Sequence, residues 1–372
     1  MSDYTGLVAS GLADQGDEVH VWCSPCADPS REVEGVTVHR ELGALSPADL
    51  RRVGRQLDQF PAPRRLLVQW VPHAFGYRSM NVGFCRWLWS RAARHGDRVE
   101  VMAHEAFLSF GRNWKQTGAA LVHRLMTVLL LRAAAVVWVS IPEWEERFRP
   151  YTLGRRVPFR WLPIPSNIPV VDHPAAVERI RLRYRAGSGM LIGHFGTHGW
   201  PITSVLEPIL SVLRDEPELT ILLIGVGSEE FRKELLRRKP ELGPLIQATG
   251  PLPPEDLSAH ITACDLLIQP YPDGVSSRRG SMMVGLAHSK PIVTTWGPLT
   301  APLWREAGAL RLAPAKDAPA FAQLIRELCR DPQERHRMGL ASRKLYDEHF
   351  ELSHTISSLR GSASLEYSGC AY

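Results

Sequence analysis

Residues 273–281, DGVSSRRGS, combine types that suit the binding of an anion. They follow the apolar run DLLIQPYP and precede the helix-like run MMVGLAHSKPIVTT. We expect a helix to begin near Ser276 or Ser277. Its free backbone N–H groups and the positive end of its dipole would then favour a negatively charged ligand at this point.

Three charged side chains of the same stretch add to this chemistry. Arg278 and Arg279 supply charge-assisted hydrogen-bond donors that suit phosphate oxygens. Asp273 can accept hydrogen bonds from hydroxyl groups such as those of a sugar. The stretch therefore predicts a site for an anion such as a phosphate, and the alternative is a solvated turn with arginines on the surface.

Glycines follow other apolar runs in the same half of the chain. IGHFGTHG (192–199) contains one such turn, and LLIGVGSEEF (222–231) places Gly225 and Gly227 in another, with Ser228 as the expected N-cap. Glycine lets a ligand approach the backbone closely, although it is also common in ordinary strand-to-helix turns.

Short apolar strands alternate with amphipathic helices along the whole chain. This alternation predicts parallel sheets that are covered by helices on both faces, an α/β fold. Such sheets bind ligands at the carboxyl ends of their strands, where the strand order reverses, and the stretches above all follow strands. The expected strands are 18–23, 36–40, 65–71, 99–104, 135–140, 190–196, 219–225, 245–250, 265–271, 290–295 and 309–313, and two late helices are expected at 317–330 and 332–349.

The length of 372 residues suits two tandem Rossmann-like, doubly wound domains. The proline-rich segment 160–174 is the predicted linker. We expect an N-terminal domain at 1–165 and a C-terminal domain at 170–350. Residues 351–372 are predicted to form a terminal helix and a tail that is disordered after Arg360.

The beginning of the sequence departs from the doubly wound pattern. The first residues, SDYTGLVASGLADQG, indicate a helix, and a strand follows it. Such a domain normally opens with a strand before that helix, so the first strand of the N-terminal domain is predicted to be missing here.

The most apolar stretch, 121–141, is long enough to raise the question of a membrane span. His123, Arg124 and Arg132 argue against one. The pattern instead predicts a helix that is followed directly by a buried strand.

The charge balance is mildly basic, with a net charge of +5 and a pI near 9.0. It fits an anionic small ligand or loose contact with an anionic membrane, and no nucleic-acid signature is present. The pair Cys23 and Cys26 lacks a second pair of ligands, so no metal site is predicted. Without a signal peptide at its start, the sequence predicts a cytoplasmic protein.

Residues 84–96, FCRWLWSRAARHG, interleave tryptophans with arginines. One interpretation is a helix in peripheral contact with the inner membrane. The preferred interpretation is an ordinary sheet-covering helix whose arginines extend to solvent.

Polar residues that follow two strands of the first half are candidates for ligand binding. His73, Tyr77 and Asn81 come after one strand, and His104 and Glu105 come after another. His104 could bond a sugar hydroxyl or could satisfy local backbone groups.

The order of these features resembles the bacterial retaining glycosyltransferases with the two-domain B-type fold, the group 1 or family-4-like class. The similar segments are IGHFGTHG, LLIGVGSE, ATGPLPPEDLSAHITACDLLIQPY and DGVSSRRGSMMVGLAHSKPIVTT, and the first half is similar more loosely. The resemblance implies transfer of a hexose from a nucleotide diphosphate sugar to a glycan or small acceptor, with retention of configuration and with no metal or further cofactor. It also implies that the domain at 170–350 binds the nucleotide sugar and that the domain at 1–165 binds the acceptor, for which His73, Tyr77, Asn81 and Glu105 are the candidates.

The resemblance also implies roles for particular residues. Asp273 and Gly274 stand where the family meets the donor sugar, and Arg278 and Arg279 where it meets the diphosphate. His104 stands where the family has a histidine close to the donor sugar. The implied catalytic residues are Asp273, His104 and Arg279, and the implied donor-binding residues are Gly196, Thr197, Gly225, Gly227, Gly250, Leu252, Gly274, Ser276, Ser277 and Arg278.

Two departures from the family pattern keep other functions open. The family's second glutamate falls near Val284, and its Arg and Lys after the first strand of the second domain are missing from GTHGWPITS. The alternatives are a non-catalytic protein that binds nucleotide or glycan, and a nucleotide-sugar epimerase with the same architecture.

Overall fold

The computed structural model describes residues 2–25, 34–111, 113–185, 187, 189–216 and 218–367. The chain folds into two compact units. Unit 1 comprises Met1–Pro163 together with Leu352–Tyr372, and unit 2 comprises Ile164–Glu351. The C-terminal segment therefore belongs to unit 1 although it follows unit 2 in the sequence.

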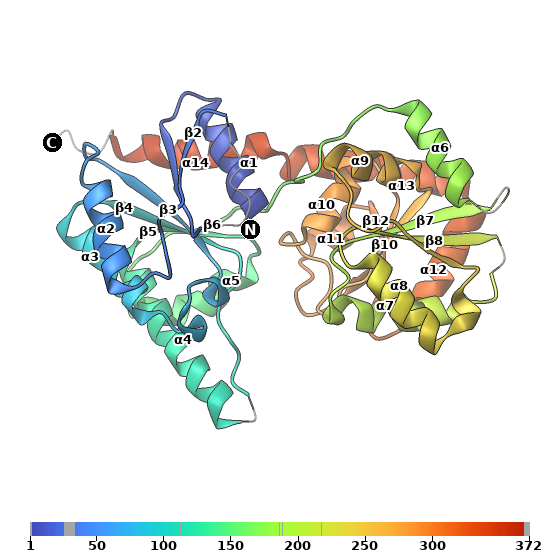
Figure 1. The fold of residues 1–372 in the computed structure, drawn as a ribbon, viewed down its shortest axis with the longest axis horizontal. Coiled ribbons are helices and arrows are strands. Elements are labelled where there is room, and N and C mark those ends of the chain that lie inside the picture. Colours follow the sequence, from blue (N-terminus) through green and yellow to red (C-terminus); the bar gives the residue numbers. More distant parts are fainter. Residues whose placement is uncertain are drawn as a thin grey trace. The chain divides into compact units, whose positions relative to one another are not determined.

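Unit 2 is built on one six-stranded parallel sheet in the order β12-β11-β10-β7-β8-β9 (Figure 1). The strand order reverses between β7 and β10, which is the position where doubly wound sheets bind ligands. The strands are β7 (Met190–Phe195), β8 (Leu219–Ile224), β9 (Ile246–Ala248), β10 (Leu266–Gln269), β11 (Ile292–Trp296) and β12 (Leu310–Pro314).

Helices cover both faces of this sheet, and the strands divide their side chains between two cores. In β8, Leu222 and Ile224 join one buried cluster, whereas Ile221 and Leu223 join the other. Alternation with a period of two explains why the strands are apolar throughout. The helices are α6 (Pro174–Tyr184), α7 (Trp200–Val212), α8 (Ser228–Arg238), α9 (Pro254–Ala263), α10 (Gly280–Ala287), α11 (Leu303–Glu306), α12 (Ala318–Arg330) and α13 (Pro332–His349).

Unit 1 has a divided sheet. A parallel pair, β1 and β2, is separate from a four-stranded parallel sheet in the order β3-β4-β5-β6. Helix α1 (Ser2–Ala13) precedes all of these strands in the described sequence. The strands are β1 (Val19–Trp22), β2 (Val36–His39), β3 (Arg65–Trp70), β4 (Arg98–Ala103), β5 (Ala134–Val139) and β6 (Phe159–Trp161).

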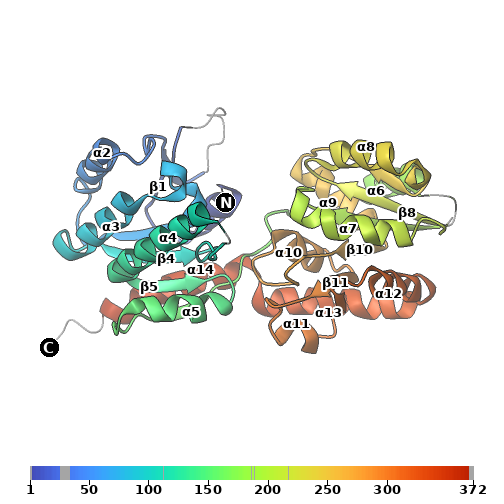
Figure 2. The same ribbon diagram turned by 90° about the horizontal axis from the view of Figure 1, so that it is seen from below.

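Three helices of unit 1 lie in one layer. Helix α3 (Val82–Arg94) packs beside both α2 (Pro47–Leu57) and α4 (Trp114–Ala133), as Figure 2 shows. Right-handed crossovers from β3 to β4 and from β4 to β5 place α3 and α4 on the same face of the sheet. Elsewhere in the unit, α1 packs against the C-terminal helix α14 (Leu352–Tyr367), and α5 (Glu143–Phe148) follows β5.

Most sequence predictions of elements are confirmed, with a few corrections. All eleven expected strands form within a few residues of their predicted bounds. The short strand β6 was missed, because its residues overlap the proline-rich segment interpreted as a linker. Disorder after Arg360 is wrong as far as Tyr367, since α14 continues to that residue. Residues 368–372 and Cys26 lie outside the described residues.

The stretch 121–141 contains the end of α4 and the whole of β5, so the prediction of a helix followed by a strand is confirmed. Within the described ranges, no helix meets the length and hydropathy needed to cross a membrane.

Candidate functional site

The loop after β10 gathers the charged residues that the sequence singled out. Asp273 forms ion pairs with both Arg278 and Arg279, one guanidinium on each carboxylate oxygen. All three side chains are partly buried. The arrangement is a compact cluster with a net charge of +1, held between β10 and α10.

The predicted start of the following helix is wrong by three to four residues. Helix α10 begins at Gly280, and Arg279 occupies the N-cap position. The N–H of Arg279 donates to the carbonyl oxygen of Ser276 (3.2 Å), which closes a turn before the helix. The two serines therefore lie in this turn, and the arginines stand next to the positive end of the helix dipole.

Gly274 fixes the shape of the loop. Its φ of +87° lies in the left-handed region, and a Cβ there would be 2.3 Å from both the Gly297 nitrogen and the Thr300 Oγ1. The loop is thus pressed against the turn that follows β11, with the N–H of Leu299 donating to the carbonyl of Asp273 (3.1 Å). Only glycine fits this position.

Arg279 is held by a second partner, the ring of Tyr271. Its guanidinium carbon lies 4.8 Å from the ring centroid, a cation–π geometry. The Tyr271 hydroxyl shares a 2.8 Å hydrogen bond with Ser281, and burial raises its pKa to about 12. The Arg279 Nε–H is buried and bonds no described residue, so it can still donate to a ligand.

Ser276 and Ser277 are both buried in the turn. The Ser276 hydroxyl is buried without a hydrogen-bond partner among the described residues. The carbonyl of Ser277 accepts from the N–H of Ile164 (3.2 Å). The turn therefore contributes one unsatisfied hydroxyl to the neighbourhood of the arginines.

The glycines after β7 and β8 pack two strand ends together. A Cβ on Gly225 would be 2.7 Å from the Gly196 oxygen, and one on Gly227 would be 2.9 Å from the Thr197 oxygen. The prediction of Ser228 as an N-cap is wrong, because Gly227 takes that position. Ser228 lies inside α8 instead.

The Ser228 hydroxyl accepts a 2.9 Å hydrogen bond from the N–H of Gly250, which ties β8 to the end of β9. Leu252 follows and packs partly buried against one of the two cores. At Gly250 and Leu252 the family resemblance predicts that the backbone contacts the nucleotide base, and this role stays a prediction.

Sequence reasoning missed three polar residues at the reversal point. His194 donates through Nδ1 to the carbonyl of Ile268 (2.8 Å), and His198 donates through Nδ1 to that of Val226 (3.3 Å). The Nε2 of each ring is buried without a partner among the described residues, as is the Oε1 of Gln269.

These three atoms are hydrogen-bond acceptors. Burial lowers the pKa of His194 to about 3 and also lowers that of His198, so both rings are neutral near pH 7. Buried acceptors of this kind are satisfied by hydroxyl or N–H groups of a ligand or by water. The signal in the sequence was the pair of histidines four residues apart in GHFGTH, which was considered only for its glycines.

His104 of unit 1 lies at the carboxyl end of β4. Its Nε2–H donates to Gln69 Oε1 (2.8 Å). Its ring packs edge-to-face against the ring of Tyr4, with the two centroids 4.9 Å apart. Burial lowers its pKa to about 4, so the imidazole is neutral and its Nδ1 is an acceptor.

The other candidates of unit 1 differ in how available they are. Asn81 is buried and caps α3 by accepting from the N–H of Phe84 (2.9 Å), while its amide donates to Phe75 (3.0 Å). Because the polar atoms of Asn81 serve this structural role, Asn81 is not proposed to bind the sugar acceptor. Exposed His73 and half-exposed Glu105 approach one another to 4.0 Å, and Tyr77 is exposed.

Known proteins share this architecture. Residues 191–331 match the family model described as glycosyl transferases group 1. No curated protein sequence matches the chain. The structure of HepE from Anabaena in complex with UDP is 17% identical with a TM-score of 0.72, covering 98% of this chain and 96% of that one.

Sucrose-phosphate synthase from Thermosynechococcus elongatus is also 17% identical, with a TM-score of 0.74 over 98% of this chain and 93% of that one. WaaG, a glycosyltransferase involved in lipopolysaccharide biosynthesis, is 13% identical, with a TM-score of 0.63 over 96% and 94%. Residues 191–331 of unit 2 are therefore similar to the group 1 glycosyl transferases, and the chain has the two-domain B-type fold of these solved structures. The predicted resemblance is confirmed.

Proposed function

We propose that the chain is a metal-independent, retaining glycosyltransferase that moves a hexose from a nucleotide diphosphate sugar to a glycan or small-molecule acceptor. The observation that carries the proposal is the ion-paired loop of Asp273, Arg278 and Arg279 beside the start of α10. It lies within the family match and follows a strand at the reversal point of the sheet. HepE is known in complex with UDP-glucose, so a UDP-hexose is the first donor to test.

The leaving diphosphate is the part of the donor that the arginines suit. Negative charge develops on it as the sugar–phosphate bond breaks, and fixed cations stabilise that charge without any reorganisation. Arg279 is fixed by Asp273 and by the face of Tyr271, and its Nε–H remains available. The positive end of α10 adds to the same potential.

Hydroxyl groups of the donor sugar need hydrogen-bond acceptors, and residues other than the arginines supply them. Asp273 provides carboxylate oxygens, while His194, His198 and Gln269 provide buried acceptor atoms. In unit 1, neutral His104 offers its Nδ1 as an acceptor, and we assign it a contact with the donor sugar. His73, Tyr77 and Glu105 are proposed for the acceptor.

The test is a calorimetric titration with UDP, GDP and ADP, repeated on Arg279→Ala with the best ligand. Loss of one charge-assisted hydrogen bond costs about 1.5–3 kcal/mol, which weakens nucleotide binding roughly 10- to 150-fold. Arg311→Ala is the matched control, because Arg311 is an exposed arginine of the same unit that lies on β12 and pairs with Glu334 of α13. Equal affinities of Arg279→Ala and the wild type would remove this arginine from the site.

One observation favours a non-catalytic protein as the second candidate. Val284, where the family has its second glutamate, is fully buried in α10 and cannot meet a ribose. Nucleotide binding without release of UDP from UDP-hexoses, across a broad panel of acceptors, would support this candidate. An NMR spectrum of the donor alone distinguishes the epimerase, because only an epimerase produces a new sugar isomer without acceptor.

A further inference from the structure

Two long stretches of unit 1 contain no acidic residue. Residues 59–96 have six arginines and no Asp or Glu, and residues 106–142 have three arginines, one lysine and no Asp or Glu. Together they supply all of α3 and α4. A surface built from these two helices is positively charged with no compensating carboxylate of its own.

Some of these cations are used inside the fold. Arg64 and Arg91 pair with buried Asp97, and Arg65 pairs with buried Glu100. Others are not used in this way. Arg86, Arg94 and Arg132 are exposed, and none of them forms a hydrogen bond or ion pair with a residue that the structure describes; the same holds for Arg51 of the neighbouring helix α2.

The same helices expose large apolar side chains. Trp89 of α3 is 43% exposed, and on α4 Trp114, Leu121 and Leu125 are 80%, 56% and 51% exposed. Positions 114, 121 and 125 are separated by seven and four residues, so they share one side of the helix. The N-terminal end of α4 projects beyond the other elements of unit 1 (Figure 1).

These residues form one continuous surface. Helices α3 and α4 lie side by side on the same face of the sheet, so their exposed sides point away from it together. We call this surface the basic face, defined as Arg86, Trp89 and Arg94 of α3 with Trp114, Leu121, Leu125 and Arg132 of α4.

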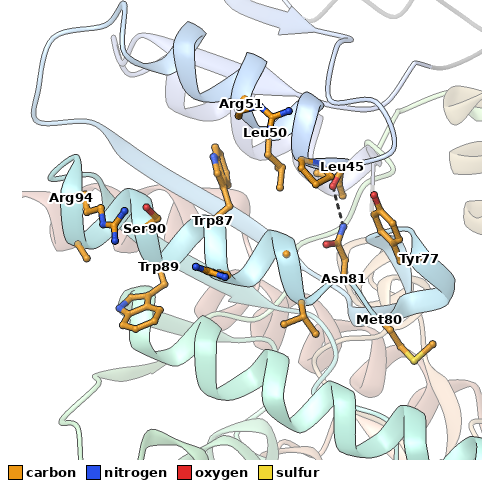
Figure 3. Close-up of a pocket in the computed structure, with 15 residues that line it drawn as sticks. Leu45, Leu50, Arg51, Tyr77, Met80, Asn81, Trp87, Trp89, Ser90 and Arg94 are labelled. Atoms are coloured by element: carbon orange, nitrogen blue, oxygen red, sulfur yellow. Dashed lines mark hydrogen bonds between the residues drawn. The ribbon is translucent and has the colours of Figure 1, made fainter.

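A groove with a volume of about 690 Å³ adjoins the basic face between α2 and α3. Leu50 of α2 and Trp87 of α3 point toward one another across it (Figure 3). Arg51, Arg86 and Arg94 also line it, and none of its lining residues is acidic. Helix α3 has 13 residues and is therefore about 20 Å long. An extended hydrocarbon chain can therefore lie in the groove along much of that length.

We propose that the basic face docks onto the surface of a membrane that contains anionic phospholipid, and that the groove takes one such lipid. Tryptophan and leucine side chains would enter the boundary between headgroups and acyl chains. The arginines would meet the lipid phosphates, and neither α3 nor α4 contains a carboxylate that would compete for them. Charge complementarity selects this occupant over a neutral apolar partner.

The test is sedimentation with vesicles of phosphatidylglycerol and phosphatidylcholine, compared with vesicles of phosphatidylcholine alone. We expect binding to the anionic vesicles only, and weaker binding in 0.5 M salt, which screens exposed charges. The variant R86Q/R94Q/R132Q should bind roughly 100-fold more weakly, because each lysine or arginine near an anionic surface contributes a similar amount to the binding free energy and three are lost together.

The matched control is R214Q/R237Q/R330Q, which removes three exposed arginines from unit 2 with the same change in net charge. It should bind vesicles like the wild type. An equal loss in both triple variants would assign the effect to net charge and overturn the proposal, as would an absence of binding by the wild type.

Leu121→Ser combined with Leu125→Ser tests the apolar part, and it should also weaken vesicle binding. If this variant instead converts a dimer to a monomer in analytical ultracentrifugation, while vesicle binding is unchanged, the face is an interface between copies and the proposal is wrong. Circular dichroism confirms that each variant is folded. UDP affinity in unit 2 should be the same in all of them, so failure here leaves the proposed transferase function unaffected.

Discussion

The two units hold their cations in different ways. In unit 2, Arg278 and Arg279 are partly buried, share one carboxylate and lie on a loop that only glycine allows to close. On the basic face of unit 1, the arginines are exposed, unpaired with any described residue and mixed with exposed tryptophan and leucine.

This difference indicates two kinds of ligand. A small cluster whose members are fixed by their neighbours can recognise a compact anion, because little ordering is needed when the ligand arrives. A broad surface of exposed side chains suits another surface, where many weak contacts add together. Single substitutions should therefore have large effects in the loop of unit 2 and small effects on the basic face.

The largest effect is expected for Gly274→Ala. The left-handed backbone costs about 1–3 kcal/mol for a side chain, and the collision with Gly297 and Thr300 adds about 1–3 kcal/mol. The free energy of unfolding of unit 2 should fall by roughly 2–6 kcal/mol, measured by urea denaturation, and UDP binding should fall with it.

Gly280→Ala is the control for this change, because a Cβ there meets no atom within 4 Å. It lies at the start of α10 and should leave stability unchanged or raise it by about 0.4–1 kcal/mol. Equal stability of the two variants would contradict the idea that the loop is rigid.

Asp273→Asn separates the two roles of the loop. It keeps the size of the side chain but removes the carboxylate that neutralises one arginine. UDP affinity should therefore stay equal or increase, whereas turnover of the UDP-hexose should fall about 100-fold or more if the carboxylate acts in the transition state. Calorimetry and a coupled assay of UDP release measure the two quantities. A parallel loss of both would make Asp273 a merely structural partner of the arginines.

Acid should destabilise both units in part through buried histidines, of which His104 in unit 1 and His194 in unit 2 are lowered furthest in pKa. Burial lowers the pKa of His104 to about 4 and that of His194 to about 3. The stabilisation is complete above the unfolded pKa near 6.5 and is lost as the pH falls toward these values, because the unfolded state binds the proton more readily.

Each histidine contributes a slope of at most about 1.4 kcal/mol per pH unit to the free energy of unfolding. Urea unfolding at pH 6.5, 5.5 and 4.5 measures this slope. His104→Asn and His194→Asn should each flatten it, and a variant that keeps the wild-type slope would show that its histidine does not titrate in this range.

The smallest effect is expected for a single change on the basic face. Arg86→Gln should weaken binding to anionic vesicles about five-fold, because one cation near such a surface contributes about 1 kcal/mol. Sedimentation with the vesicles measures it. A loss as large as that of the triple variant would mean that Arg86 belongs to a built site like that of unit 2.

The sequence by itself determined the alternation of strands and helices, the two α/β units and the similarity of residues 191–331 to the group 1 glycosyl transferases. These properties depend on local periodicity and on runs of residues such as DGVSSRRGS. Residues that are close together in the sequence therefore determine them. The same local information led to errors where two signals overlapped, as at β6, whose residues adjoin the prolines of the predicted linker.

Only the tertiary structure decided which polar groups are available. The pairing of Asp273 with both arginines, the use of Asn81 as a cap and the buried acceptors of His194 and Gln269 are set by where the backbone places these groups. The basic face likewise exists because two crossovers bring α3 and α4 onto one side of a sheet. Such neighbours lie far apart in the sequence, so the periodicity of the sequence does not reveal that they meet.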